Sequence, residues 1–277
     1  MANNITEANF SEDSTISTLP LAAIIIGDEI LSAQRQDQHL YWLSKTLSER
    51  GLVLSWVHYI GDNCQQIANA IRYSLVPANI VFCFGGIGTT PDDHTRQAAA
   101  MAFDEPLIQH PQATQCIIQR FADKAYPNRI RMAQLPATAT LIPNPINQVP
   151  GFSMQHHHFL PGFPEMAWPM VQWLLGTRYS HLSQRVRPIR LSVIVIEGIE
   201  SELLPLMETL VAAYPTIRLA SLPSYGNSCY AGPHIELSIS GPIQQAQQAF
   251  AQLISGLEQL EQRFIRMAHN ATPSPPS

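Results

Sequence analysis

The chain has 277 residues and a formal net charge of −5, with 16 lysines and arginines against 21 aspartates and glutamates. This length suits one large domain or two smaller ones, each with its own hydrophobic core. We find no basic stripe of the kind that nucleic-acid binders use to displace counterions from phosphates. The composition therefore argues against nucleic-acid binding.

The two ends of the chain are polar, and we expect residues 1–18 to be a flexible extension and residues 267–277 a disordered tail. The first residues lack a positively charged region followed by an apolar stretch, which argues against a secretory signal. The apolar run at 19–26 is too short to span a bilayer. The cysteines form no CxxC pair, which favours a reduced, cytoplasmic protein: Cys64, Cys83, Cys116 and Cys229.

Residues 19–176 alternate between strand and helix patterns. Short apolar runs predict strands at 21–26, 52–60, 80–84, 140–142 and 159–160. Apolar residues at helical spacing predict helices at 37–50, 64–75, 95–102, 111–121 and 165–175. This alternation is typical of an α/β domain with a mostly parallel sheet and helices on both faces.

A polar, arginine-containing stretch at 177–188 is predicted to be a linker. The residues after it, 189–266, are predicted to form a small α+β domain in the order βαββα. Its strands are expected at 189–196, 217–222 and 235–240, and its helices at 200–213 and 244–264.

The strongest chemical signal is the sequence GGIGTTPDDHT, from Gly85 to Thr95, which follows a buried strand and precedes a helix. Glycines let the backbone approach a ligand closely, and the amides of such a turn can bind an anion. The acids Asp92 and Asp93 would repel a phosphate unless a cation lay between them, so the motif favours phosphate with a hard metal ion. The alternative is an ordinary turn in which Asp92 or Asp93 caps the next helix.

Two further acid-bearing loops follow predicted strands. Asp28 and Glu29 lie in GDEIL, and Glu165 lies in PGFPEM together with Pro161 and Gly162. Loops at the carboxyl ends of parallel strands line the ligand crevice of open α/β sheets. Each acid is equally consistent with a residue of a helical first turn. Taken together, the three loops favour one shared site.

The adjacent histidines His156, His157 and His158 suggest a metal site at first sight. Neighbouring side chains on a strand point in alternating directions and rarely converge on one ion. We therefore expect a polar surface turn here.

These motifs, in this order, resemble the signatures of the molybdopterin-binding (MoaB/Mog-like) family, and of its CinA-like branch in particular. GDN at Gly61, RMAQLP at Arg131 and NP…PGF from Asn144 to Phe152 also match that branch. The resemblance implies a three-layer αβα molybdopterin-binding-like domain with a mostly parallel sheet at 19–176, followed by the small α+β domain. We expect a stand-alone form that lacks the C-terminal amidohydrolase domain of many relatives.

The resemblance also implies roles for individual residues. The phosphate would bind at Gly85, Gly86, Gly88, Thr89 and Thr95. The catalytic residues would be Asp93, Asp92, Asp28 and Glu29, with Asp93 and Asp28 at the metal. The rest of the substrate would contact Asp37, Pro161, Gly162 and Glu165. The family commonly has asparagine where this chain has His39, so the chain departs from the family pattern at that contact.

Two functions are implied. One is a metal-dependent pyrophosphatase acting on ADP-ribose or FAD with Mg²⁺, Mn²⁺ or Co²⁺, and with K⁺ as a further ion. The other is a non-hydrolytic protein of molybdenum cofactor metabolism whose ligand is molybdopterin. A decayed site in a mainly structural protein is a third reading. In each case the expected partner is a small nucleotide or pterin, with no nucleic acid and no membrane, and the chain is expected to form a homo-dimer or homo-trimer.

Overall fold

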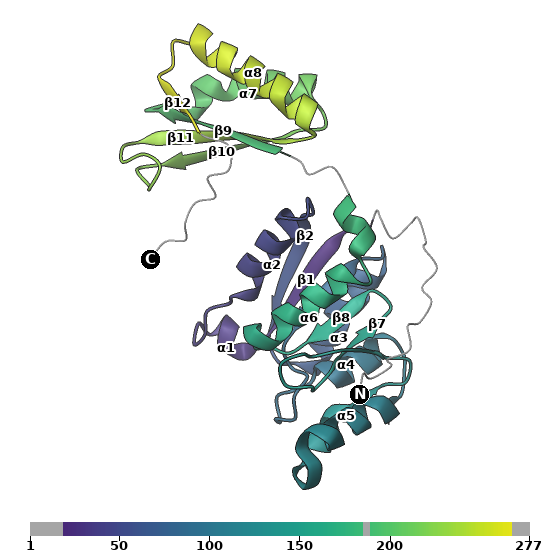
Figure 1. Ribbon diagram of the computed structural model, residues 1–277. Coiled ribbons are helices and arrows are strands. Elements are labelled where there is room, and N and C mark those ends of the chain that lie inside the picture. Colours follow the sequence, from purple (N-terminus) through teal and green to yellow (C-terminus); the bar gives the residue numbers. More distant parts are fainter. Residues whose placement is uncertain (1–18, 185–188, 268–277) are drawn as a thin grey trace. The chain divides into compact units, whose positions relative to one another are not determined.

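The computed structural model describes residues 19–184 and 189–267, which form two compact units on either side of residue 185 (Figure 1). The predicted N-terminal extension, residues 185–188 of the predicted linker and residues 268–277 of the predicted tail lie outside the described residues. None of the helices in the described ranges has the length and apolarity that a membrane span requires.

The first unit is built on a six-stranded sheet with the order β2-β1-β3-β8-β7-β6. Four neighbouring strands are parallel: β2 (Leu54–Ile60), β1 (Leu21–Ile26), β3 (Ile80–Phe84) and β8 (His157–Leu160). At the far side, β7 (Gly151–Met154) pairs antiparallel with both β8 and β6 (Thr140–Ile142). The sheet is thus mixed but mostly parallel, as predicted.

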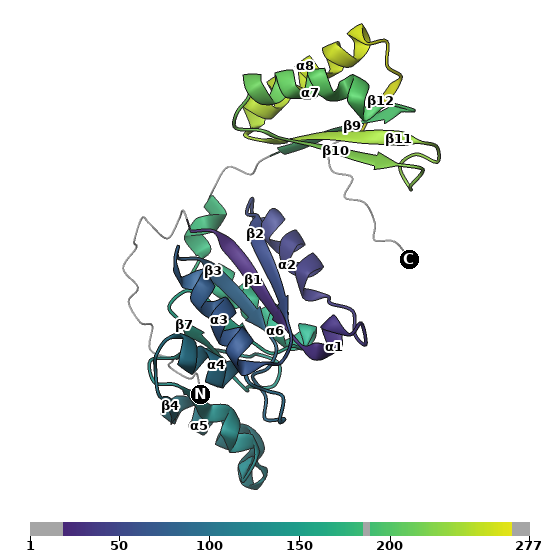
Figure 2. The ribbon, with the colours of Figure 1, turned by 180° about the vertical axis from the view of Figure 1, so that it is seen from behind.

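Helices cover both faces of this sheet, which gives the predicted three layers (Figures 1 and 2). Alternate residues of β1 point to opposite faces. Ala22 and Ile24 pack with α3 (Cys64–Leu75) and α4 (Thr95–Ala102) in one core. Ala23 and Ile25 pack with α2 (His39–Ser48) and α6 (Pro164–Gly176) in the other. Both faces of β1 and β3 are buried, which explains their uninterrupted apolar sequences.

Several short elements escaped prediction. The one-turn helix α1 (Asp28–Leu31) follows β1. Around α5 (Pro111–Phe121), β4 (Leu107–Gln109) pairs with β5 (Gln134–Pro136), and two 3₁₀ helices, η2 (Ala122–Ala125) and η3 (Arg129–Ala133), connect α5 to β5. Strands β4 and β5 contact α4 (Figure 2). All the short elements that escaped prediction here are three to five residues long, which is too short for periodicity to detect.

Two of the three adjacent histidines are buried, so the predicted polar surface turn was wrong for them, whereas His156 lies partly buried in the turn before β8. His157 and His158 are 2% and 0% exposed within β8. Nδ1 of His158 lies 2.8 Å from Ser153 Oγ and its Nε2 lies 2.8 Å from Tyr179 OH, while His157 Nε2 lies 2.7 Å from Ser74 Oγ. These hydrogen bonds reduce the free-energy cost of burying the polar histidine rings.

The predicted linker also begins too early, because residues just after α6 pack into the first unit. Tyr179 is 1% exposed and Leu182 is 2% exposed, and both belong to the core between α2 and α6. A further 3₁₀ helix, η4 (Ser180–Gln184), follows Tyr179.

The second unit has the order β9 (Ile189–Ile196), α7 (Glu200–Ala213), β10 (Arg218–Ser224), β11 (His234–Gly241), α8 (Ile243–Gln259) and β12 (Phe264–Arg266). Its antiparallel sheet, β10-β11-β9-β12, is the split βαβ arrangement. The predicted helix at 244–264 was too long, because the chain turns at Glu261, whose φ is 53°, and Phe264 then pairs with β9.

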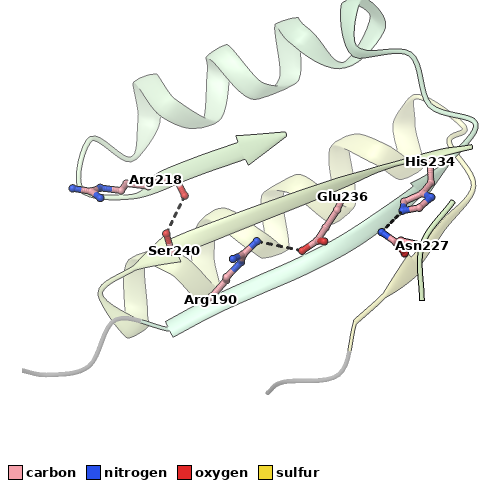
Figure 3. Close-up of polar contacts among 6 residues, drawn as sticks. All are labelled: Arg190, Arg218, Asn227, His234, Glu236 and Ser240. Carbon is pink, nitrogen blue, oxygen red and sulfur yellow. Dashed lines mark hydrogen bonds and ion pairs between the residues drawn. The ribbon is translucent and has the colours of Figure 1, made fainter. Parts of the chain in front are cut away.

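Helices α7 and α8 pack on one face of this sheet. Polar contacts link its strands (Figure 3): Arg190 of β9 forms an ion pair with Glu236 of β11 at 3.3 Å. Between β10 and β11, Asn227 Nδ2 lies 3.1 Å from Nε2 of the buried His234, which pins the loop of this hairpin.

Candidate functional site

The carboxyl ends of the four parallel strands meet at one edge of the first sheet, and the predicted site loops follow them there. Across the sheet they appear in the order Gly61-Asp62, Gly27-Asp28, Gly85-Gly86 and Pro161-Gly162, after β2, β1, β3 and β8. Such an edge is where open α/β sheets bind ligands. The topology therefore brings the three loops singled out by sequence together, and adds a fourth after β2.

The turn after β3 requires glycine at two positions. Gly85 has a φ of 105°, and a Cβ there would lie 2.3 Å from the Ile26 carbonyl oxygen. Gly86 has a φ of 68°, and its Cβ would lie 2.2 Å from Thr95 Oγ1. The tight turn thus depends on the absence of side chains.

Thr95 supports this turn from below. Its hydroxyl donates to the Gly85 carbonyl at 2.9 Å and its amide donates to the Gly86 carbonyl at 2.9 Å. Because Thr95 is fully buried, the predicted direct contact between Thr95 and phosphate is wrong. Its role is to hold the turn.

Asp93 folds the second half of the loop. Its carboxylate accepts hydrogen bonds from the Gly88 amide at 3.0 Å, the Thr90 amide at 2.7 Å and the Thr90 hydroxyl at 2.5 Å. Three of the roughly four acceptor positions of a carboxylate are thus filled within the loop. Neither Asp93 nor Asp92 caps α4, because the N-cap residue is His94.

Three amides of the loop remain available. The backbone N–H groups of Gly86, Ile87 and Thr89 donate to no acceptor within residues 19–184 and 189–267. All three residues are only partly buried. Partly exposed, unpaired amides in a glycine turn before a helix are the donors that an anion such as phosphate uses.

A pair of aspartates lies beside this turn. The amide of Asp28 donates to Asp62 Oδ2 at 2.8 Å, and the amide of Asp62 donates to Asp28 Oδ1 at 3.2 Å. Burial raises the pKa of Asp62, and the negative charges of Asp28, Glu29 and Asp92 raise it further. Asp92 itself is fully exposed, and the neighbouring Thr90 side chain lowers its pKa. The carboxylates are close enough to repel one another, which a bound cation would relieve.

A pocket of about 230 Å³ opens on the α2 side of the same edge. The lining includes Glu29, Arg35, Asp37, His39, Phe84 and Glu165, together with the backbone at Gly162. Four residues were predicted to contact the part of the substrate beyond its phosphate. Asp37, Gly162 and Glu165 line this pocket, and Pro161 does not. Arg35 is the one cation among the lining residues, and it lies 6.0 Å from the centre of the Phe163 ring.

Asp37 and His39 shape the wall of this pocket. The Asp37 carboxylate accepts from the amides of His39 and Leu40 and from the Tyr59 hydroxyl, at 2.8, 3.1 and 2.8 Å. The ring of His39 stacks on Phe84 with centroids 4.3 Å apart, and its Nε2 lies 3.1 Å from the Gly162 carbonyl oxygen. Burial lowers the pKa of His39 despite that contact and the nearby acids, which favours a neutral ring that donates to Gly162.

Among the described residues, protein side chains alone do not form a complete metal-binding site. Within the two described ranges, no three His, Cys, Asp or Glu side chains are grouped to hold an ion. Asp28 and Asp62 each keep one carboxylate oxygen without a hydrogen bond. Mg²⁺ is commonly bound by one or two carboxylates together with phosphate oxygens and water. The residues therefore fit a divalent cation that binds with a phosphorylated ligand.

Sequence reasoning missed two residues of the site. Asp62 was seen only as part of the GDN motif, although its position after a strand was a usable signal. The buried Arg96 donates to the Gly88 carbonyl at 2.6 Å and to the carbonyl of Arg131, and no local pattern indicated this.

Comparisons with known proteins agree with this geometry. Residues 22–181 match the family described as "Probable molybdopterin binding domain". A CinA-like protein of Geotalea uraniireducens (strain Rf4) is 32% identical over 176 residues, 60% of this chain and 42% of that protein. The "NMN amidohydrolase-like protein YfaY" of Escherichia coli (strain K12) is 30% identical over 237 residues, 83% of this chain and 57% of that protein. The chain thus spans about half the length of these curated relatives.

Among solved structures, CinA of Thermoplasma acidophilum, described as having unknown function, aligns with a TM-score of 0.53 and 24% identity. The alignment covers 57% of this chain and 97% of that one. This likeness supports the fold of the first unit.

Proposed function

Since the chain belongs to the molybdopterin-binding-domain family and to its CinA-like branch, we propose that it hydrolyses the pyrophosphate bond of a nucleotide such as ADP-ribose or FAD with a divalent metal ion. One observation carries the proposal. A turn with three unpaired amides lies at the same sheet edge as the Asp28–Asp62 pair and the pocket. A diphosphate needs anion donors, a hard cation and room for its organic groups, and the edge offers amide donors, carboxylates that can hold a cation and a pocket.

The roles divide among the loops. The amides of Gly86, Ile87 and Thr89 would bind the diphosphate, and the pocket beside His39 and Phe84 would take a flat ring. Asp28 and Asp62 would hold the divalent cation together with phosphate oxygens. When bound, such a cation neutralises charge on the phosphoryl group and lowers the pKa of bound water.

Asp93 receives a different role from the one the sequence suggested. Because its carboxylate is already engaged by Gly88 and Thr90, we assign it to organising the loop. Asp62 then takes the place of Asp93 beside Asp28 at the metal. Glu29, whose carboxylate lies against Gly27 and lines the pocket, is placed to orient the attacking water or the substrate.

The proposal is tested by incubating the protein with ADP-ribose, and separately with FAD, in the presence of Mn²⁺, Co²⁺ or Mg²⁺ and of K⁺. AMP is then measured by chromatography. We expect metal-dependent AMP release that Asp62→Asn reduces at least 100-fold (on the order of 3 kcal/mol of barrier). Asp123→Asn, at an exposed aspartate of η2, is the matched control and should retain the full rate. No AMP with any metal, or equal rates for the two variants, would overturn the proposal.

A second function is binding without hydrolysis, in which the same edge holds molybdopterin. The observation that favours it is the match of residues 22–181 to the family described as "Probable molybdopterin binding domain". Thermal unfolding separates the two functions, because a ligand at 100 times its Kd adds about 2.7 kcal/mol of stability. Stabilisation by a phosphorylated pterin, with none by ADP-ribose or FAD, would favour the carrier.

A further inference from the structure

The 3₁₀ helix η3 brings the RMA segment close to the glycine turn at Gly88. Arg96 makes the connection, since one guanidinium nitrogen donates to the Gly88 carbonyl at 2.6 Å and the other to the carbonyl of Arg131. That second nitrogen also lies 3.4 Å from the carbonyl oxygen of Gln134. The backbone carbonyl of Arg131 is therefore separated from the Gly88 carbonyl by the width of one guanidinium group.

The charge of Arg96 is buried without a direct counter-ion. Its side chain is 3% exposed, its Nε has no hydrogen-bond partner, and all its hydrogen bonds go to backbone carbonyls. The nearest carboxylate acting on it is Asp93, which is itself bonded to the Gly88 and Thr90 amides. Gly88 is thus fixed by Asp93 at its N–H and by Arg96 at its C=O.

Arg131 adds a second positive charge at this place. Burial is the main cause that lowers the pKa of Arg96, and the charge of Arg131 lowers it further, against the opposing effect of Asp93. The two guanidinium groups are therefore in electrostatic reach of each other, and the Asp93 carboxylate also acts on Arg96. Together the three side chains carry one net positive charge beside a turn that also presents unpaired amides.

The side chain of Arg131 is exposed and has no bonding partner among the described residues. It makes no hydrogen bond, ion pair or ring contact there. Its neighbours differ in this respect, because Arg129 lies 4.9 Å from the Phe121 ring centre and donates to the Lys124 carbonyl. Arg120 also lies over Phe121, at 5.6 Å, and donates to the Asn147 carbonyl.

We propose that Arg131 contacts a phosphate group of the ligand at the glycine turn, and that Arg96 positions it there by holding its backbone. This inference rests on the proposed function, because it assumes that a phosphate binds at the Gly86–Thr89 amides. An arginine suits the task because its planar guanidinium forms two parallel hydrogen bonds to phosphate oxygens.

The test is the Kd of inorganic pyrophosphate with Mg²⁺, measured calorimetrically at low and moderate salt. Arg131→Gln should weaken binding about tenfold and reduce its salt dependence, while Arg131→Lys recovers part of the affinity. Arg129→Gln, two residues away on the same 3₁₀ helix, is the matched control and should bind as the wild type does. Because Arg131 is exposed, we expect its variants to melt within about 1 °C of the wild type.

The outcomes separate the two claims. Equal affinities of Arg131→Gln and Arg129→Gln, with normal binding by the wild type, would overturn the role of Arg131 and leave the proposed function standing. A wild type that binds no pyrophosphate at all would overturn both.

Discussion

Asp93→Asn tests whether this aspartate organises the loop. The carboxylate accepts from two backbone amides, of Gly88 at 3.0 Å and of Thr90 at 2.7 Å, on its two different oxygens. An asparagine has only one acceptor oxygen, so its NH₂ group would face one of these amides, donor against donor. At least one charge-assisted hydrogen bond is lost and one half-buried amide is left unpaired.

The magnitude follows from those contacts. A hydrogen bond to a charged group contributes about 1.5–3 kcal/mol, and the half-buried position favours the lower end, about 2 kcal/mol. For a domain of this size, 1 kcal/mol corresponds to about 2–4 °C in Tm. Asp93→Asn should therefore lower the Tm of the first unit by about 4–8 °C, and should weaken pyrophosphate binding because the neighbouring amides lose their fixed positions.

Differential scanning calorimetry measures this, with Asp92→Asn as the matched control. Asp92 is exposed and its carboxylate accepts from neither of these amides, so its variant should melt within about 1 °C of the wild type. If Asp93→Asn and Asp92→Asn melt together, the loop does not depend on Asp93, and its carboxylate is free for the metal as the sequence first suggested.

Three further predictions concern buried groups and the acid pair. Burial, with His156, lowers the pKa of His157 to about 4, and burial keeps the pKa of His158 well below its usual range. Unfolded histidine titrates near 6.5, so only the unfolded chain takes up these protons between about pH 6.5 and 4. Stability should be full above this window and fall within it by about 1.4 kcal/mol per pH unit for each histidine. Urea midpoints that are equal at pH 7.5 and pH 5 would contradict this. Tyr179→Phe removes the hydroxyl 2.8 Å from His158 Nε2, and should cost about 1–3 kcal/mol; an unchanged urea midpoint would show that the network is dispensable. Gly61→Ala would place a Cβ 2.2 Å from Asp28 Oδ1, so it should separate Asp28 from Asp62 and slow AMP release without unfolding the protein; an unaltered rate would argue against the pair.

The main elements of the fold could be predicted because each has a strong periodic or apolar pattern. The strand Ile80–Phe84 and the helix Thr95–Ala102 match their predicted bounds. The short elements could not be predicted, since β4 and β5 are stabilised by pairing with each other across α5, and η3 by packing against α5. The predicted helix at 244–264 ran past the end of α8 for a different reason, because a left-handed turn at Glu261 ends the helix in a sequence that stays amphipathic.

That three acid-bearing loops meet at one edge of the sheet was predictable from the strands they follow, but the hydrogen bonds of each side chain were not. A sequence shows that Asp93 is near the glycines, yet it cannot show that the carboxylate is turned into the loop. Likewise, the histidine triplet seemed exposed because its partners, Ser74 and Tyr179, are distant in sequence. Roles of this kind depend on which hydrogen bonds are already satisfied, and only the fold determines that.

The dissociation constant of ADP-ribose, compared between the wild type and Gly86→Val, tests most directly that a phosphorylated ligand binds at the glycine turn. Valine at this position needs a φ of 68° and a Cβ 2.2 Å from Thr95 Oγ1, so it should distort the turn. With Ca²⁺ in place of the catalytic metals, the wild type should bind ADP-ribose, and Gly86→Val should bind at least tenfold more weakly. Equal affinity of the two proteins, with an intact fold in each, would place the ligand elsewhere and contradict the proposed site.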